Sequence, residues 1–184
     1  MRSASPTSSA TGAWRAALAR TLREGEVSSP RGQRTLEIAH QTTVVDLARP
    51  VLASPARRLS YAYLAAEAIW VLDGDDRVET IAPYNERLRE FSDDGLTFFG
   101  AYGPRIAAQL PYAVRKLLAD RDTRQAVITT WRPSPPTTRD VPCTVALAFQ
   151  ARGGRLNAHV FMRSSDLWLG WPYDVFTFSS LVAL

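Results

Sequence analysis

The chain has 184 residues, a length that favours one domain with a sizeable hydrophobic core. Hydrophobic residues make up 46% of it and charged residues 22%, which is ordinary for a soluble globular protein. Cys143 is the only cysteine, so an intramolecular disulfide is excluded, in keeping with a reducing cytoplasm. The sequence has neither an apolar run of membrane-spanning length nor the apolar core of a secretion signal, so we expect a cytoplasmic protein without a membrane partner.

The net charge of +4 comes almost entirely from arginine, because Lys116 is the only lysine. Arginine binds planar oxyanions through two parallel hydrogen bonds, so a phosphate-bearing ligand is plausible. A mild excess of basic residues does not establish nucleic-acid binding, and we expect no nucleic-acid partner.

The first half of the chain is predicted to be mainly helical, from the spacing of its apolar residues. In chain order we expect a disordered tail over 1–12, a helix over 13–24, a loop over 28–34, strands over 35–40 and 42–47, and helices over 59–72 and 79–90. In the helix over 59–72, Glu67 lies within or beside an apolar stripe that includes Tyr63 and Trp70. A carboxylate in that position is costly to bury unless it has a partner or a function.

The second half is predicted to alternate between a helix and β-strands. In chain order we expect a loop over 91–103, a helix over 106–120, strands over 125–131, 144–150 and 156–161, and another element from Phe176 onward. The sequence Arg152-Gly153-Gly154-Arg155 predicts a tight hairpin turn between the last two strands.

The stretch 162–174 follows the last strand and concentrates polar residues around a glycine and a proline. Arg163 and Ser164 together suit a phosphate, because a planar fork of donors lies beside a small hydroxyl. Gly170 predicts a turn whose backbone approaches a ligand, and Asp174 beyond it could face a polar ligand edge. The alternative is a strand, a turn and the start of a helix with solvated charges.

Pro142-Cys143 at a strand edge, the hairpin, and the Arg-Ser-x-Asp and Leu-Gly-x-Pro motifs of the stretch 162–174 resemble the thymidylate synthase family. The resemblance runs from about Arg31 to the end of the chain. Further blocks occur in the same order: Glu67 with Trp70-Val71-Leu72-Asp73-Gly74, Ala101-Tyr102-Gly103, Asp122-Thr123-Arg124, and Trp131.

This resemblance implies an α+β fold, with a mixed, mainly antiparallel sheet and helices packed on one face. We therefore expect a single domain over 13–184 that forms a homodimer through the other face of the sheet. Family members continue beyond the position of Leu184, so the chain is expected to lack the family's C-terminal part, with its His-x-Tyr pair and its closing tail.

The resemblance also implies catalytic roles. Cys143 matches the nucleophile that adds to C6 of a pyrimidine, and Arg163 is placed to favour its thiolate. Glu67 matches a general acid or base, and Tyr102 matches a tyrosine that assists proton removal. The structural alternatives are an inert buried cysteine, loop packing for Tyr102, and an ordinary helix carboxylate.

Substrate and cofactor residues follow from the same resemblance. Arg31, Arg124, Arg163 and Ser164 match the set that binds the phosphate of a nucleoside monophosphate, with Arg124 contributed across the dimer interface. The register leaves Arg34 as a rival to Arg31, and solvated loop charges are the alternative for Arg31 and Arg124. Asp166 and Gly170 match positions that hold the cofactor 5,10-methylenetetrahydrofolate, the alternative for Asp166 being a turn carboxylate. No metal site is expected.

Asp174 is the most informative departure from the family pattern, because most thymidylate synthases have an asparagine there. That asparagine pairs with O4 and N3–H of uracil, whereas a carboxyl group can accept from the amino group of cytosine. The change resembles the deoxycytidylate hydroxymethylase branch, so we expect a hydroxymethylase that acts on dCMP or CMP. The alternatives are a thymidylate synthase acting on dUMP and a non-catalytic nucleotide-binding relative.

Overall fold

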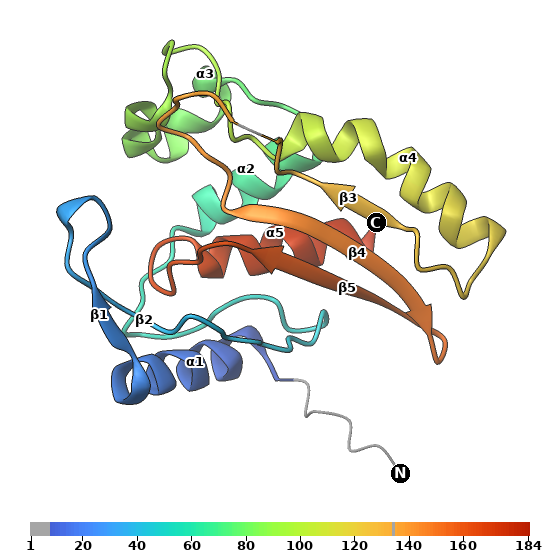
Figure 1. Ribbon diagram of the computed structural model, residues 1–184, viewed down its shortest axis with the longest axis horizontal. Coiled ribbons are helices and arrows are strands. Elements are labelled where there is room, and N and C mark those ends of the chain that lie inside the picture. The colour runs from blue at the N-terminus through green and yellow to red at the C-terminus, as the bar shows by residue number, and fades with distance from the viewer. Residues whose placement is uncertain (1–7, 134) are drawn as a thin grey trace. The chain divides into compact units, whose positions relative to one another are not determined.

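The computed structural model (Figure 1) describes residues 8–133 and 135–184. Its chain divides into two compact units. The first unit comprises residues up to Leu59 together with Asp166–Ser179, and the second comprises Ser60–Ser165 and Ser180–Leu184. The single domain expected over 13–184 stays a prediction.

The first unit contains α1 (Ala10–Glu24), the short strands β1 (Glu26–Ser28) and β2 (Thr35–Glu37), and most of α5 (Trp171–Ala183). β1 and β2 pair antiparallel, and a single 3₁₀ turn, η1 (Pro30–Gly32), lies between them. Ser9 caps α1 by accepting a hydrogen bond from the Gly12 N–H at 3.2 Å.

Two expectations for the first unit are corrected. Residues 1–7 of the expected disordered tail lie outside the described residues, but α1 begins at Ala10 because Ser9 supplies its cap. Among the described residues, the strand expected over 42–47 is reduced to an isolated bridge between Ser8 and Val45.

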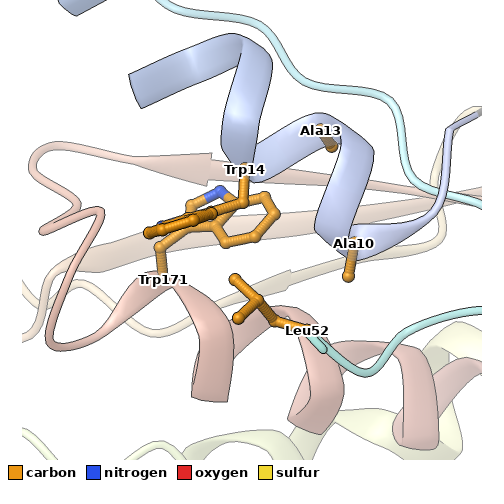
Figure 2. Close-up of a cluster of buried hydrophobic side chains, with 5 residues drawn as sticks. All are labelled: Ala10, Ala13, Trp14, Leu52 and Trp171. Atoms are coloured by element: carbon orange, nitrogen blue, oxygen red, sulfur yellow. The ribbon is translucent and has the colours of Figure 1, made fainter. Parts of the chain in front are cut away.

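The core of the first unit gathers around two tryptophans. Trp14 of α1 and Trp171 at the start of α5 are 3% and 7% exposed and pack together with Leu52, Ala10 and Ala13 (Figure 2). The indole N–H of Trp14 donates to the Leu167 carbonyl oxygen at 2.6 Å, so the buried ring also keeps a polar partner. This cluster joins the N-terminal helix to the segment that leads into α5.

The second unit contains the larger sheet, whose strands have the order β3-β4-β5 and pair antiparallel. These strands are β3 (Val127–Thr129), β4 (Thr144–Arg152) and β5 (Arg155–Met162). Gly153 and Gly154 form the β4–β5 turn with φ values of 58° and 73°, which confirms the predicted hairpin. Side chains directly opposite one another share a face. Ile128 and Leu147 are fully buried on one face, whereas Phe161 is 65% exposed on the other.

Helices α2 (Tyr61–Leu72) and α4 (Gly103–Ala119) pack against each other, and α4 also packs on β3 and β4 (Figure 1). The second unit therefore has the expected α+β arrangement of helices on one face of an antiparallel sheet. The single helix expected over 79–90 is wrong: the segment forms α3 (Val78–Ile81) and the 3₁₀ turns η2 (Ala82–Tyr84) and η3 (Glu86–Phe91). Pro83 accounts for the first break, because it has no backbone N–H to continue the helix. No helix of the described residues is long and apolar enough to cross a membrane.

Replacing Trp14 with alanine tests the core of the first unit. We expect the free energy of unfolding to fall by about 3–5 kcal/mol, because the change leaves a large cavity and removes the hydrogen bond to Leu167. Urea denaturation measures it. Leu22→Ala is the matched control on the same helix: Leu22 is 69% exposed, so its loss should change stability by less than about 0.5 kcal/mol. Equal effects of the two substitutions would contradict the assignment of Trp14 to a core.

Candidate active site

Cys143 lies immediately before β4, and Arg163 immediately follows β5. Because the two strands form one hairpin, the start of the first meets the end of the second. The Arg163 N–H donates to the Cys143 carbonyl oxygen at 2.9 Å, and the Cys143 thiol is partly buried. The structure thus brings together two of the predicted site residues that are far apart in sequence.

An irregularity in the hairpin decides which residue faces Cys143. From Arg152 to Ala146 the register is regular, but Thr144 then pairs with Met162, so Val145 is an extra residue. Without this bulge the register would place Thr144 opposite Arg163 and Cys143 opposite Ser164. The carbonyl oxygen of Val145 accepts from the N–H groups of Thr130 and Trp131 at 3.0 and 3.2 Å, which fixes the bulge. A bulge that re-aims a side chain in this way is common beside active sites.

The guanidinium of Arg163 folds back over the segment that precedes β4. Its Nε donates to the Pro142 carbonyl oxygen and its Nη2 to the Val141 carbonyl oxygen, both at 2.9 Å. Nη2 also lies 3.9 Å from the Cys143 Sγ, and the guanidinium lies 5.8 Å from the centre of the Trp131 ring. A fixed positive charge at this distance favours the thiolate over the thiol. These bonds use Nε and Nη2, so the Nη1 donors remain for an anion.

A second loop is tied to the same segment at two points on either side of Cys143. The Tyr102 hydroxyl accepts from the Thr144 N–H at 3.2 Å, and the Asp140 carboxylate accepts from the Gly100 N–H at 2.7 Å. A Cβ at Gly100 would lie 2.5 Å from the Asp140 carbonyl oxygen, so only glycine permits this approach. Tyr102 is therefore next to the candidate nucleophile.

Asp140 and Arg105 are site-supporting residues that the sequence analysis missed. Burial raises the pKa of Asp140, and it does so more strongly than the Gly100 N–H lowers it. Arg105 is 7% exposed, and its guanidinium donates to the carbonyl oxygens of Phe99 and Thr130. Neither partnership leaves a periodic sequence signal, since each joins a side chain to backbone atoms outside its own helix or loop.

Glu67 lies on α2 and accepts a hydrogen bond from the Tyr63 hydroxyl at 2.5 Å. Burial of the carboxyl group raises its pKa to about 7, and the bond from Tyr63 opposes the rise. A carboxyl group with this pKa can both give and take a proton near neutral pH. The sequence predicted Tyr63 only as a member of the apolar stripe. Its spacing of four residues from Glu67 on a helix is nevertheless one at which two side chains meet.

Asp166, Gly170 and Asp174 belong to the first unit, in the turn that leads into α5 and in its first turn. Asp166 Oδ1 accepts from the N–H groups of Trp168 and Leu169, both at 2.7 Å, and its carbonyl oxygen accepts from Gly170 and Trp171. The Gly170 carbonyl oxygen in turn accepts from the Asp174 N–H at 3.0 Å. Asp174 lies in the first turn of α5, where the helix dipole stabilises a negative charge.

Arg57 holds this turn in place, and the sequence analysis did not identify it. Its Nε donates to the Trp168 carbonyl oxygen at 2.7 Å. Its guanidinium lies 5.9 Å from the centre of the Trp168 ring and 5.8 Å from that of Tyr173, within the range of a cation–π contact. Trp14 packs on Trp168 from another element, with 5.6 Å between the ring centres.

The other predicted phosphate ligands are exposed. Arg31 and Arg34 lie in the loop between β1 and β2, Arg124 lies before β3, and Ser164 follows Arg163. Arg31 has a φ of 52°, a left-handed conformation that costs a non-glycine residue roughly 1–2 kcal/mol and that occurs in tight turns and at active sites. Among the described residues, no group of His, Cys, Asp or Glu is arranged to hold a metal ion.

Comparison with known proteins gives a family match over almost the whole chain. The family model described as thymidylate synthase matches residues 13–184. The match covers both units and includes every predicted site residue.

Several relatives carry names that describe a related activity. The chain is 31% identical to a deoxyuridylate hydroxymethyltransferase of Bacillus phage SP01, over 90% of this chain and 49% of that protein. It is 39% identical to one of Pseudomonas phage M6, over 62% of this chain and 36% of that protein. It is 30% identical to a putative thymidylate synthase of Methanothermobacter thermautotrophicus, over 86% of this chain and 72% of that protein. The chain thus spans about half or less of the length of the two phage relatives.

Replacing Arg163 with glutamine tests its effect on Cys143. Because Cys143 is the only cysteine, the rate of alkylation by iodoacetamide reports on this thiol alone. We expect the rate near neutral pH to fall at least threefold, since a neutral side chain no longer favours the thiolate. Arg155→Gln, at the exposed far end of β5, is the control and should leave the rate unchanged. Equal rates in the two variants would remove Arg163 from this role.

Replacing Glu67 with glutamine tests the raised pKa. The folded-state pKa of about 7 lies above the ordinary glutamate pKa of 4.5, so the native state of the wild type loses stability as pH rises between these values. Glutamine does not titrate, so the variant should gain stability relative to the wild type by up to about 3 kcal/mol between about pH 5 and pH 8. Denaturation at both pH values measures this difference. Glu79 has a side chain that is 77% exposed, so Glu79→Gln should show no comparable change. If the stability difference between Glu67→Gln and the wild type is the same at both pH values, the raised pKa is refuted.

Proposed function

The chain belongs to the thymidylate synthase family, and we propose that it is a pyrimidine-nucleotide C5 hydroxymethylase acting on dCMP or CMP. The one-carbon donor in this proposal is 5,10-methylenetetrahydrofolate. The observation that carries the choice of substrate is Asp174, which occupies the position where the family resemblance places the residue that reads the base.

Asp174 is suited to cytosine by its charge. Its place in the first turn of α5 favours the ionised carboxylate, which can accept hydrogen bonds but not donate them. The amino group of cytosine can donate a hydrogen bond to this carboxylate. A bridging water molecule can donate one to the N3 acceptor. Uracil presents the O4 acceptor at the same place, and two acceptors facing each other repel. The expected discrimination comes mainly from this unfavourable contact with uracil.

The turn over 166–170 supports the choice of cofactor. Trp168 and Leu169 are 44% and 63% exposed, so they offer apolar surface beside the carboxylate of Asp166. A flat ring system with N–H donors fits a site that combines apolar surface with a carboxylate. When bound, methylenetetrahydrofolate supplies a one-carbon unit at the oxidation level of formaldehyde. Asp166 and Gly170 would hold it.

The protein's own residues then account for the remaining chemistry. Arg163 and Ser164, with Arg31 and Arg124, would bind the phosphate. Cys143 would add to C6 of the base, which makes C5 nucleophilic, and would leave again at the end of the reaction.

Glu67 and Tyr102 would move the protons, including the one removed from C5. The hydroxyl group of the product comes from water. The reaction therefore needs no reductant, unlike thymidylate formation, in which a hydride must be transferred.

A homodimer is part of the same proposal. Val127 and Phe161 lie on the face of the sheet away from α4 and are 37% and 65% exposed. Exposed apolar side chains on an open sheet face support burial against a second copy. Arg124 is exposed and lies three residues before the start of β3, so pairing of this face would bring it near the edge of the partner's sheet.

A deoxyuridylate hydroxymethyltransferase is the second candidate, and the names of the phage relatives favour it. It differs from the first proposal only in the base. A thymidylate synthase acting on dUMP and a non-catalytic nucleotide-binding protein are further outcomes of the same experiment.

Replacing Asp174 with asparagine tests how the base is read. We expect the preference for dCMP over dUMP to shift at least tenfold toward dUMP, because the amide can pair with both O4 and N3–H of uracil. Release of tritium from C5 of dCMP, CMP and dUMP measures the preference of the wild type and of Asp174→Asn. Identification of the product separates hydroxymethyl from methyl transfer.

Each result of this experiment has one interpretation. A wild type that prefers dUMP refutes the cytidylate assignment and supports the second candidate. A variant with an unchanged preference means that Asp174 does not read the base. Absence of turnover with all three nucleotides, in the presence of the folate, supports the non-catalytic alternative.

A further inference from the structure

Tyr63 lies one helical turn before Glu67 on α2, and the two side chains are in contact. Tyr63 is 6% exposed, and its hydroxyl donates to Glu67 Oε1 at 2.5 Å. The tyrosine is also held at its backbone: its N–H donates to the Ser60 side chain at 3.2 Å, which caps α2. The partner of the Glu67 carboxyl group is thus part of a rigid element, and a spacing of four residues on a helix aligns the two side chains.

We propose that Tyr63 is a positioning residue for Glu67: its hydroxyl occupies Oε1 and leaves Oε2 as the oxygen that exchanges protons with the substrate. This inference rests on the acid–base role of Glu67 in the proposed function. A carboxylate has two equivalent oxygens and rotates about its last bond, so a side chain without a partner would present either one. The bond from Tyr63 removes that freedom before the substrate arrives.

The same bond sets how readily Glu67 gives up its proton. Burial raises the pKa of Glu67 to about 7, and the Tyr63 hydroxyl, by donating to the carboxylate form, lowers it. The elements packed against α2 carry the titratable or charged groups Glu79 of α3, Tyr84 of η2, and Arg105, Tyr112, Arg115 and Lys116 of α4. Among the described residues, none of these contributes to the shift, so Tyr63 alone opposes burial.

Loss of the hydroxyl should therefore have two effects that loss of ring packing would not have. The carboxyl group would titrate at higher pH, and proton transfer would slow because Oε2 is no longer favoured. Tyr63→Phe isolates the hydroxyl, since phenylalanine keeps the ring in the core. Tyr61→Phe is the matched control: Tyr61 is 59% exposed on the same helix and loses the same group.

The first measurement needs no turnover. In full-length protein with ¹³C-labelled glutamate side chains, the Glu67 carboxyl signal is assigned by its absence in Glu67→Gln. We expect its titration midpoint to rise by about one pH unit in Tyr63→Phe and to stay unchanged in Tyr61→Phe. Identical midpoints in the wild type and Tyr63→Phe would overturn the proposal. If Tyr63→Phe does not fold, the wild type supplies the test: its low-field Tyr63 hydroxyl proton signal should move upfield in Glu67→Gln, and no movement would overturn the proposal.

The second measurement follows the pH dependence of tritium release from C5 of the preferred nucleotide. The part of the pH profile that reports on Glu67 is the limb that disappears in Glu67→Gln. In Tyr63→Phe this limb should move to higher pH, and kcat near pH 7 should fall about tenfold. KM for the nucleotide should stay within about twofold, because Tyr63 is not placed to bind it. An unmoved profile would overturn the proposal. Absence of turnover in the wild type would refute the proposed function alone, because the carboxyl titration still tests Tyr63.

Discussion

The hairpin β4–β5 and its bulge are the constraint on which the site in the second unit depends. The antiparallel pairing returns the chain to its starting edge, and the extra residue Val145 places Cys143 rather than Thr144 beside Arg163. The backbone of the segment before β4 then holds the guanidinium through the carbonyl oxygens of Val141 and Pro142. The neighbour of the cysteine is therefore a consequence of strand register, and a shift of one residue would replace Arg163 with Ser164 beside it.

Glu67 is held in its position at a cost to stability. A buried carboxyl group is unfavourable when ionised, and Tyr63 is the one described group that offsets this cost. Asp140 presents a similar balance between burial and the Gly100 N–H. Glu67 lies on α2, which packs against α4, so the helices that fold the unit also provide the low-polarity surroundings in which its carboxyl group can hold a proton near neutral pH.

Much of this could be predicted from sequence, for identifiable reasons. The alternation of apolar residues and the glycine pair Gly153-Gly154 predicted the β4–β5 hairpin. The helical spacing of apolar residues along α2 predicted that Glu67 lies on a largely apolar face. The bulge at Val145, the Asp140–Gly100 contact and the position of Arg57 had no such signal, because each depends on atoms from distant segments. The helix expected over 79–90 failed for a local reason, since Pro83 interrupts an otherwise helical pattern.

The central claim is that Cys143 is a nucleophile toward C6 of a pyrimidine nucleotide. The most direct test is the intact mass of the protein after incubation with 5-fluoro-dCMP and methylenetetrahydrofolate, because fluorine cannot leave C5 as a proton does and the adduct is trapped. The account predicts a mass increase located by peptide mapping on Cys143, and none in Cys143→Ser. An unmodified wild type, with 5-fluoro-dUMP as well as with 5-fluoro-dCMP, would contradict it.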